Sequence, residues 1–150
     1  MYRKISEFLQ DASAKTIQAD ATVMEAVSAM ISERHDYVLV MEDGAIVGIF
    51  TERDFLNRVI GKRLLPAEIF MRDVMSPKPE TLMRADYISY AIERMARHGF
   101  RNIPIVDENS PPAVLTVWNV MSHLSQILAD IEESGIDKDI INELTDTGGG

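Results

Sequence analysis

Apolar and polar positions along the chain follow two periods, which together predict a regular succession of strands and helices. Unbroken apolar runs indicate buried strands, whereas apolar residues spaced three and four apart indicate the buried face of a helix. Thr22 and Glu25 form the capping box expected at a helix start, and Asp43-Gly44 favours a tight hairpin. The first half is therefore predicted to read strand, helix, strand, strand, helix over residues 14–18, 22–34, 37–41, 46–50 and 52–60.

The second half repeats this pattern 65 residues later without a gap. Thr51 is matched by Thr116, and Ala26 is matched by Ala91. The corresponding elements are predicted over residues 80–83, 87–98, 102–106, 113–116 and 117–131. We therefore predict a tandem repeat, with a first unit and its N-terminal segment over residues 1–70 and a second unit over 71–131. Two similar units on one chain imply pseudo-twofold symmetry, and the cleft between them is the expected place for a ligand.

Residues 132–150 are predicted to form an acidic C-terminal tail that is partly disordered. Ile136, Ile140, Ile141 and Leu144 have the spacing of a short amphipathic helix. The last three residues are glycines, for which we expect disorder.

Composition narrows the classes of function. The chain has 150 residues, of which 46% are hydrophobic, and a net charge of −9. This acidity argues against nucleic-acid binding, because phosphate backbones need a basic face. No apolar run approaches the ~18 residues of a membrane span, and no signal segment is visible at the N-terminus. The absence of cysteine is typical of a cytoplasmic protein, and the three histidines, without metal-ligand spacing, predict no metal site.

Thr51 and Asp54 lie where the second predicted helix begins. A hydroxyl, a carboxylate and unpaired backbone N–H groups at this point would attract a phosphate. A carboxylate can also accept hydrogen bonds from both hydroxyls of a ribose. The same Thr-x-x-Asp spacing is a common helix cap. Both interpretations stay open, because a cap can yield to a ligand.

Three segments together resemble the cystathionine-β-synthase (CBS) domain pair, or Bateman module. They are Gly-Ile-Phe-Thr-Glu-Arg-Asp at residues 48–54, Asp-Val-Met-Ser-Pro at 73–77 and Arg-Asn-Ile-Pro-Ile-Val-Asp at 101–107. The likeness covers residues 5 to 130, nearly the whole chain. It implies an α/β (α+β) fold of tandem β-α-β-β-α repeats whose two small sheets pack against each other. It also implies two related clefts that hold adenine nucleotides or other adenosyl compounds, and assembly into a homodimer.

The resemblance implies a ligand site at the first motif, with Thr51 and Asp54 contacting the phosphate and the ribose. Arg53 and Arg101 are candidates for the cations that a phosphate needs, although a solvated surface charge is the alternative for each. By analogy with the family, the adenine would lie near the first strands. The residues implied there are Lys15, Thr16, Ile17, Tyr37 and Val38, for which ordinary core packing is the alternative.

A second, weaker cleft is expected around Thr81, Thr116 and Asn119. Asn119 replaces the acidic residue of the first motif, and an amide should grip a ribose less well than a carboxylate. Ala113 replaces the glycine, and the bulky Trp118 either fills this cleft or forms a dimer contact. We therefore expect this cleft to be weak, empty or altered in its ligand preference.

The predicted function is a regulatory module and not an enzyme. It would bind AMP, ADP, ATP, NAD or S-adenosylmethionine without requiring a cofactor, and signal to an unknown protein partner. An adaptor or scaffold protein with vestigial nucleotide clefts is the alternative, which the altered second motif favours slightly. An enzyme acting on a bound nucleotide is the weakest option, because no nucleophile with a nearby general base stands out.

Overall fold

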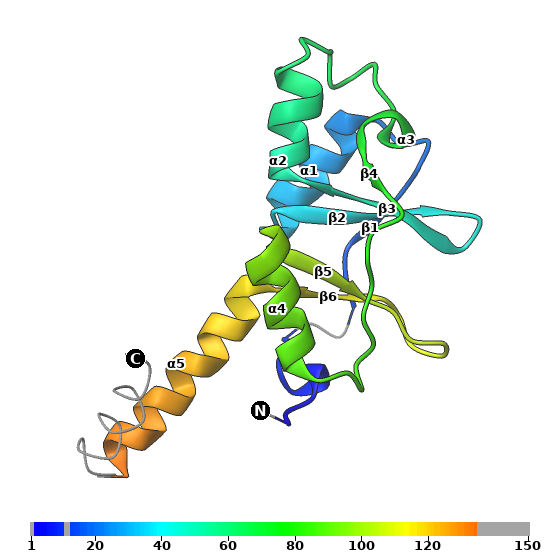
Figure 1. The fold of residues 1–150 in the computed structure, drawn as a ribbon. Coiled ribbons are helices and arrows are strands. Elements are labelled where there is room, and N and C mark those ends of the chain that lie inside the picture. The colour runs from blue at the N-terminus through cyan, green and yellow to red at the C-terminus, as the bar shows by residue number, and fades with distance from the viewer. Residues whose placement is uncertain (1, 11–12, 135–150) are drawn as a thin grey trace.

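The computed structural model describes residues 2–10 and 13–134 of the chain. Figure 1 shows two similar halves stacked along one axis, each a small sheet with helices beside it. In chain order the elements are η1 (Ile5–Glu7), β1 (Thr16–Gln18), α1 (Val23–Glu33), β2 (Tyr37–Glu42), β3 (Ala45–Thr51), α2 (Glu52–Asp54), the π-helical η2 (Phe55–Ile60), α3 (Met71–Val74), β4 (Ser76–Pro77), α4 (Ile88–His98), β5 (Asn102–Ile105), β6 (Ala113–Thr116) and α5 (Val117–Glu133).

Helix α1 begins at the predicted capping box. The Thr22 hydroxyl accepts from the backbone N–H of Glu25 at 3.2 Å, and the Glu25 carboxylate accepts from the N–H of Thr22 at 2.7 Å. These contacts satisfy N–H groups that a helix start otherwise leaves unpaired. The helix ends at Arg34, which has a left-handed backbone with φ of 56°. The prediction of a helix over residues 22–34 is therefore confirmed to within one residue at each end.

The two strands of the first hairpin join through the predicted turn. Asp43 and Gly44 both have positive φ, 50° and 76° respectively. Two consecutive residues with positive φ match the turn whose twist suits a two-residue hairpin. Strands β2 and β3 consequently pair antiparallel, with Tyr37 opposite Thr51 and Glu42 opposite Ala45.

The two sheets pack face to face. The four-stranded sheet has the order β1-β2-β3-β4, and the second sheet contains β5 and β6. Alternation along the strands sends Val38 and Phe50 into the core beneath α1. It sends Tyr37 and Leu39 to the opposite face, where they share a buried cluster with Val114 of β6. The predicted α/β fold of tandem repeats with two packed sheets is thereby confirmed.

The second repeat departs from the predicted pattern at its start. Residues 80–83 form no strand, and only an isolated parallel bridge joins Leu82 to Ile105. The chain instead contributes β4 to the edge of the first sheet, where Pro77 lies opposite Gly48. Leu82 alone pairs with β5, because Pro104 has no N–H to extend the pairing on one side and the N–H of Arg84 donates to the Asp107 carboxylate, at 3.2 Å, on the other.

The helix predicted over 52–60 also differs in detail. Its first turn is α-helical and its remainder is the π-helix η2. Here the N–H of Gly61 reaches back five residues to the carbonyl of Leu56, at 2.7 Å. Gly61 ends the helix as predicted, but with an ordinary right-handed φ of −61°.

The short helix that precedes each repeat in the sequence packs into the core of the other repeat. We call these two helices, η1 and α3, the lead-in segments. Ile5 of η1 is fully buried in the core of the second repeat, and its N–H donates to the carbonyl of Asp86 at 3.0 Å. Met71 of α3 is fully buried in the first repeat's core, and its N–H donates to the carbonyl of Ala21 at 2.9 Å. The predicted division between residues 70 and 71 follows the sequence repeat, whereas the two hydrophobic cores exchange these segments.

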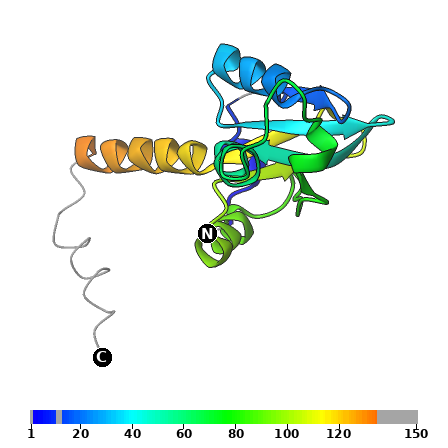
Figure 2. The ribbon, with the colours of Figure 1, turned by 90° about the horizontal axis from the view of Figure 1, so that it is seen from above.

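Helix α5 extends well beyond the two sheets, as Figure 2 shows. It begins within the second repeat, where Val120 is buried, and then leaves the body of the molecule. Exposed apolar side chains along it are Trp118, Met121, Leu124 and Leu128. Of the tail predicted over 132–150, residues 135–150 and the four apolar residues named for it lie outside the described residues.

Candidate functional site

The first motif forms a capping box at the start of α2. The N–H of Asp54 donates to the Thr51 hydroxyl at 3.4 Å, and the Asp54 Oδ2 atom accepts from the N–H of Thr51 at 3.0 Å. The N–H of Glu52 is also taken, because it donates to the carbonyl of Asp36 at 3.0 Å. The capping interpretation is therefore observed. It leaves few unpaired N–H groups for a phosphate at this helix start, so side chains must supply most of the donors.

The second carboxylate oxygen of Asp54 ties the first repeat to the segment that follows it. Ser76 donates its hydroxyl to Asp54 Oδ1 at 3.1 Å, and Arg58 Nε lies 3.6 Å from the same atom. Arg58 also donates to the carbonyl of Met75 at 2.5 Å. Asp54 is only 8% exposed, although it remains part of a cleft wall. A ligand hydroxyl that bound Asp54 would therefore have to share its oxygens with Ser76 and Arg58.

We call the hollow at this motif cleft 1. It has a volume of about 570 Å³, within the range of small-molecule sites. The structure brings four predicted residues together in its lining, namely Thr51, Arg53, Asp54 and Arg101. It adds polar residues that the sequence analysis did not single out, namely Asn57, Arg58, Ser76, Lys78, Glu80, Arg94 and Asn102. Apolar walls come from Ile49, Ile103 and Pro104.

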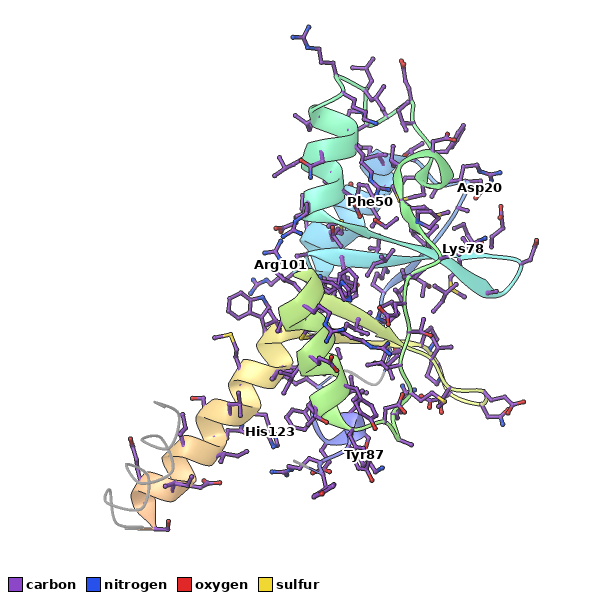
Figure 3. The ribbon with its side chains drawn as sticks, viewed as in Figure 1. Asp20, Phe50, Lys78, Tyr87, Arg101 and His123 are labelled. Atoms are coloured by element: carbon purple, nitrogen blue, oxygen red, sulfur yellow. The ribbon has the colours of Figure 1, made fainter. Side chains whose placement is uncertain are left out.

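Cleft 1 is cationic although the protein is acidic. Five arginine and lysine side chains line it, against the two carboxylates of Asp54 and Glu80. Each carboxylate already has a cationic partner, since Arg94 lies 2.6 Å from Glu80 and Arg58 lies near Asp54. No ion pair to a described residue is recorded for the remaining three, which are Arg53, Lys78 and Arg101. Figure 3 shows Lys78 and Arg101 at the level where the two repeats meet.

We call the hollow at the second motif cleft 2. It has a volume of about 690 Å³, and its lining includes Thr116, Trp118 and Asn119. The N–H of Thr116 donates to the Asn119 side-chain oxygen at 2.9 Å, and the N–H of Asn119 donates to the Thr116 hydroxyl at 3.1 Å. The amide therefore reproduces the capping box of the first motif without its negative charge. On the far wall, Tyr37 stacks on His35 with ring centroids 5.0 Å apart.

The structure disperses the residues that the family analogy assigned to the adenine. Tyr37 lies in cleft 2, opposite the second motif. Lys15, Thr16, Ile17 and Val38 are not among the residues lining either cleft, nor is Thr81. Val38 is fully buried in the core, and the Lys15 ammonium lies 3.7 Å from Glu33. The geometry favours the packing alternative for Val38, whereas Lys15 and Thr16 are exposed, and the ligand role of all these residues remains a prediction.

A crossed arrangement explains this dispersal. The motif of the first repeat faces residues 77–80 and 101–104, which belong to the second repeat. The motif of the second repeat faces residues 34–37 of the first. The 65-residue offset could have indicated Lys78 and Glu80 as site residues, because they are the counterparts of Ser13 and Lys15 at the first predicted strand. A repeat alone, however, does not say which copy of a strand faces which copy of a motif.

Comparison with known proteins decides the family. The CBS domain matches this chain twice, at residues 6–61 and 71–126. The chain belongs to the CBS domain family. One relative is the meiotically up-regulated gene 70 protein of Schizosaccharomyces pombe, 34% identical over 113 residues. Those residues are 75% of this chain and 16% of that protein, and a match to protein MK0525 of Methanopyrus kandleri covers 64% of this chain and 50% of that protein at 32% identity.

Solved CBS structures share the fold at low sequence identity. A protein with CBS domains from Burkholderia ambifaria has a TM-score of 0.76 at 17% identity, covering 81% of this chain and 93% of its own. CBSX2 was solved in complex with AMP, with a TM-score of 0.68, 20% identity and coverage of 83% and 97%. The CBS domain pair of MJ0100 was solved with 5′-methylthioadenosine and S-adenosyl-L-methionine, with a TM-score of 0.71, 15% identity and coverage of 81% and 99%.

A thin polar partition separates the two clefts of this CBS pair. The Asn102 Nδ2 atom, on the cleft 1 side, donates to Asp36 Oδ1, on the cleft 2 side, at 3.3 Å. Arg101 lines both clefts. The backbone carbonyl of Asp36 accepts from the N–H of Glu52 at 3.0 Å. The carbonyl of Arg101, the counterpart of Asp36, accepts in the same way from the N–H of Val117 at 2.8 Å. The two motifs are thus joined at the centre of the molecule.

Within residues 2–10 and 13–134, no group of three or more histidine or acidic side chains is placed to hold a metal ion. The helices there are also too short or too polar to cross a membrane.

Proposed function

We propose that this CBS pair is a regulatory module that binds an adenosyl ligand in cleft 1 and transmits its occupancy to a partner protein. CBS domain pairs generally bind adenosyl ligands and are typically non-catalytic. The observation that carries the proposal is the position of Thr51 and Asp54 in the wall of a cationic cleft between the repeats. The ribose hydroxyls would donate to Asp54, and the phosphate would meet Arg53 and Arg101.

The contacts of Asp54 suggest how occupancy would be transmitted. Ser76 and Arg58 hold the segment between the repeats against this carboxylate. A ribose that donates to Asp54 would compete with the Ser76 hydroxyl and loosen that tie. A ligand shifts a conformational equilibrium only by its difference in affinity for the two states. Competition for Asp54 supplies such a difference, because the tie and the ligand use the same oxygen atoms.

Binding is tested by calorimetry with AMP, ADP, ATP, NAD and S-adenosylmethionine. Trp118 is the chain's only tryptophan and lines cleft 2, so its fluorescence reports on that cleft separately. We expect at least one of the five ligands to release heat while the Trp118 emission changes little. Asp54→Asn should weaken this binding about tenfold or more, whereas Asn119→Ala, at the matched position in cleft 2, should leave it unchanged. A folded protein that binds none of the five would refute the proposal.

An adaptor function is the second candidate, and the exposed apolar side chains of α5 favour it. Met121 and Leu128 are 53% and 60% exposed, and they lie on the helix that extends from the body. Such a surface suits a second copy of the chain or a protein partner. Trp118, expected from the sequence either to fill cleft 2 or to form a dimer contact, is 62% exposed near the start of the same helix.

Two measurements separate the candidates. Sedimentation of the protein and of Met121→Asp/Leu128→Asp would show whether α5 joins two copies, and we expect the native protein to be the dimer. Capture of partner proteins with and without the ligand found by calorimetry tests signalling. Capture that Asp54→Asn leaves unchanged would favour the adaptor, and capture that depends on both the ligand and Asp54 would favour the regulatory module.

A further inference from the structure

We propose that cleft 1 selects adenosyl ligands that carry phosphate over those that carry none, and that Lys78 is a determinant of this selectivity. The inference rests on the proposed function, since it names the class of adenosyl ligand for the same cleft. Its basis is the surplus of three cations in cleft 1, Arg53, Lys78 and Arg101, over the two carboxylates that line this cleft and are already paired.

The charge of cleft 1 opposes the charge of the whole protein. The chain has a net charge of −9, so its overall field disfavours an anion. Unpaired cations gathered in one concave site repel one another, and a bound phosphate with a charge of about −1.5 to −2 relieves that repulsion. S-adenosylmethionine carries a net positive charge instead, because its sulfonium and ammonium groups outweigh its carboxylate, and 5′-methylthioadenosine carries no charge. Neither ligand brings net negative charge to the three cations.

Cleft 2 lacks this surplus. Its cationic lining residues are Arg34 and the shared Arg101, and they are balanced by Asp36 and Glu52. Asp36 is the counterpart of Arg101 in the repeat, so the same position carries opposite charges in the two halves. Cleft 2 also carries the 62% exposed indole of Trp118 where cleft 1 carries Arg53. Charge therefore favours a phosphate in cleft 1 and gives no such preference in cleft 2.

Substitution of Lys78 tests the charge of cleft 1 separately from that of cleft 2. It lines cleft 1 and not cleft 2, in contrast to Arg101, which lines both. Its backbone is left-handed, with φ of 47°, and its N–H donates to the carbonyl of Val47 at 3.1 Å. Glutamine is unbranched at Cβ as lysine is, so Lys78→Gln removes the charge without adding backbone strain. Figure 3 labels Lys78 where the linking segment crosses the sheet edge.

The test compares three ligands and two variants. Affinities for ADP, 5′-methylthioadenosine and S-adenosylmethionine are measured by calorimetry on the native protein, Lys78→Gln and Lys62→Gln, with Trp118 fluorescence reporting on cleft 2. Lys62 is exposed and lines neither cleft, so its variant makes the same change in net charge outside the site. We expect ADP to bind at least tenfold more tightly than the other two ligands. Lys78→Gln should weaken ADP about tenfold, the size of one charge-assisted hydrogen bond, and leave 5′-methylthioadenosine within about twofold.

The outcomes separate this inference from the proposed function. If 5′-methylthioadenosine or S-adenosylmethionine binds as tightly as ADP, the module still binds an adenosyl ligand but the selectivity is refuted. Equal weakening of ADP by Lys78→Gln and Lys62→Gln would reduce Lys78 to a contributor to net charge and refute its role. If ADP quenches Trp118 fluorescence and its affinity is unchanged by Lys78→Gln, the site lies in cleft 2 and the inference for cleft 1 is refuted. Binding of none of the three by folded protein would overturn the inference and count against the proposed function together.

Discussion

The two clefts of this protein are built on the same scaffold and differ at a few matched positions. Both are walled by a Thr-capped helix start from one repeat and by a strand start from the other. Cleft 1 has a carboxylate at Asp54 and a cation at Arg101, whereas cleft 2 has an amide at Asn119 and a carboxylate at Asp36. The capping geometry survives the exchange of Asp for Asn. A helix cap therefore preserves the scaffold while the charge beside it is free to change.

The largest expected effect comes from Gly48 in β3, which pairs with the edge strand β4. A Cβ atom on Gly48 would contact the Met75 sulfur and lie 2.8 Å from Met75 Cγ and 3.0 Å from the carbonyl oxygen of Ser76. We expect Gly48→Ala to lower the free energy of unfolding by about 1–3 kcal/mol, the usual cost of overpacking. Because β4 carries Ser76, the variant should also disturb the contact with Asp54. Urea unfolding and ADP calorimetry measure the two effects.

The matched control lies in the other half. Ala113 occupies the same position in the second repeat, where only β5 pairs with β6 among the described residues. Ala113→Gly should cost only about 0.5–1 kcal/mol, through chain entropy. Equal losses in the two variants would show that the crossing of β4 imposes no special constraint at Gly48.

The second prediction exchanges the carboxylate of cleft 1 for the amide found in cleft 2. Asp54→Asn gives cleft 1 the side chain of cleft 2 in the same cap. We expect adenosyl binding measured by calorimetry to weaken about tenfold or more, because a charged acceptor of the ribose hydroxyls becomes a neutral one. The cap should survive, as it does at Asn119, so helix content measured by circular dichroism should change little. Binding at native affinity would show that Asp54 is only a cap.

The reverse exchange sharpens the comparison with a smaller expected effect. Asn119→Asp restores the carboxylate in cleft 2 but not the cations of cleft 1. We expect a severalfold gain at most in adenosyl affinity there, read from Trp118 emission, because Asp36 and Glu52 still oppose a phosphate. A gain that matched cleft 1 would mean that the carboxylate alone decides occupancy.

The smallest expected effect concerns the two lead-in segments. The backbone N–H of Lys4 and then the Arg3 guanidinium lower the pKa of the Glu7 carboxyl below its ordinary value of 4.5. Its carboxylate therefore stabilises η1 at pH above 4.5, and this contribution is lost as the pH falls through the lower folded pKa. The counterpart of Glu7 in the other segment is Arg72, whose guanidinium cannot accept the hydrogen bonds that the Glu7 carboxylate accepts. Exchange of backbone amides should show η1 loosening below pH 4.5 before α3 does, and Glu7→Gln should remove the difference.

Periodicity predicted the elements well where local rules dominate. The caps at Thr22 and Thr51 and the Asp43-Gly44 turn depend on neighbours within a few residues, and they form as expected. The strand predicted over 80–83 failed because its hydrogen bonds depend on a distant edge. Pro104 of β5 has no N–H to extend the pairing beyond Leu82, and the N–H of Arg84 donates to the Asp107 carboxylate instead of to the sheet.

Only part of the candidate site could be predicted from the sequence. Thr51, Asp54, Arg53 and Arg101 carry a recognisable spacing, and the structure brings them into one cleft. Lys78 and Ser76 carry no such spacing, and they join the site because the linking segment adds an edge strand to the first sheet. Tyr37 was expected beside Asp54 but faces the second motif instead.

By itself the sequence determined that the chain has two copies of one unit, where α1, α2, α4, α5 and the first hairpin begin, and which motif carries the stronger charge. These follow from contacts within a few residues and from an offset that holds along the chain. Only the tertiary structure decided that each motif faces the strand of the opposite repeat, and that η1 and α3 exchange cores. The physical reason is that two nearly equivalent halves offer equivalent apolar surfaces. Which surface a segment covers is then decided by where the linking chain can reach, and local pattern carries no record of that.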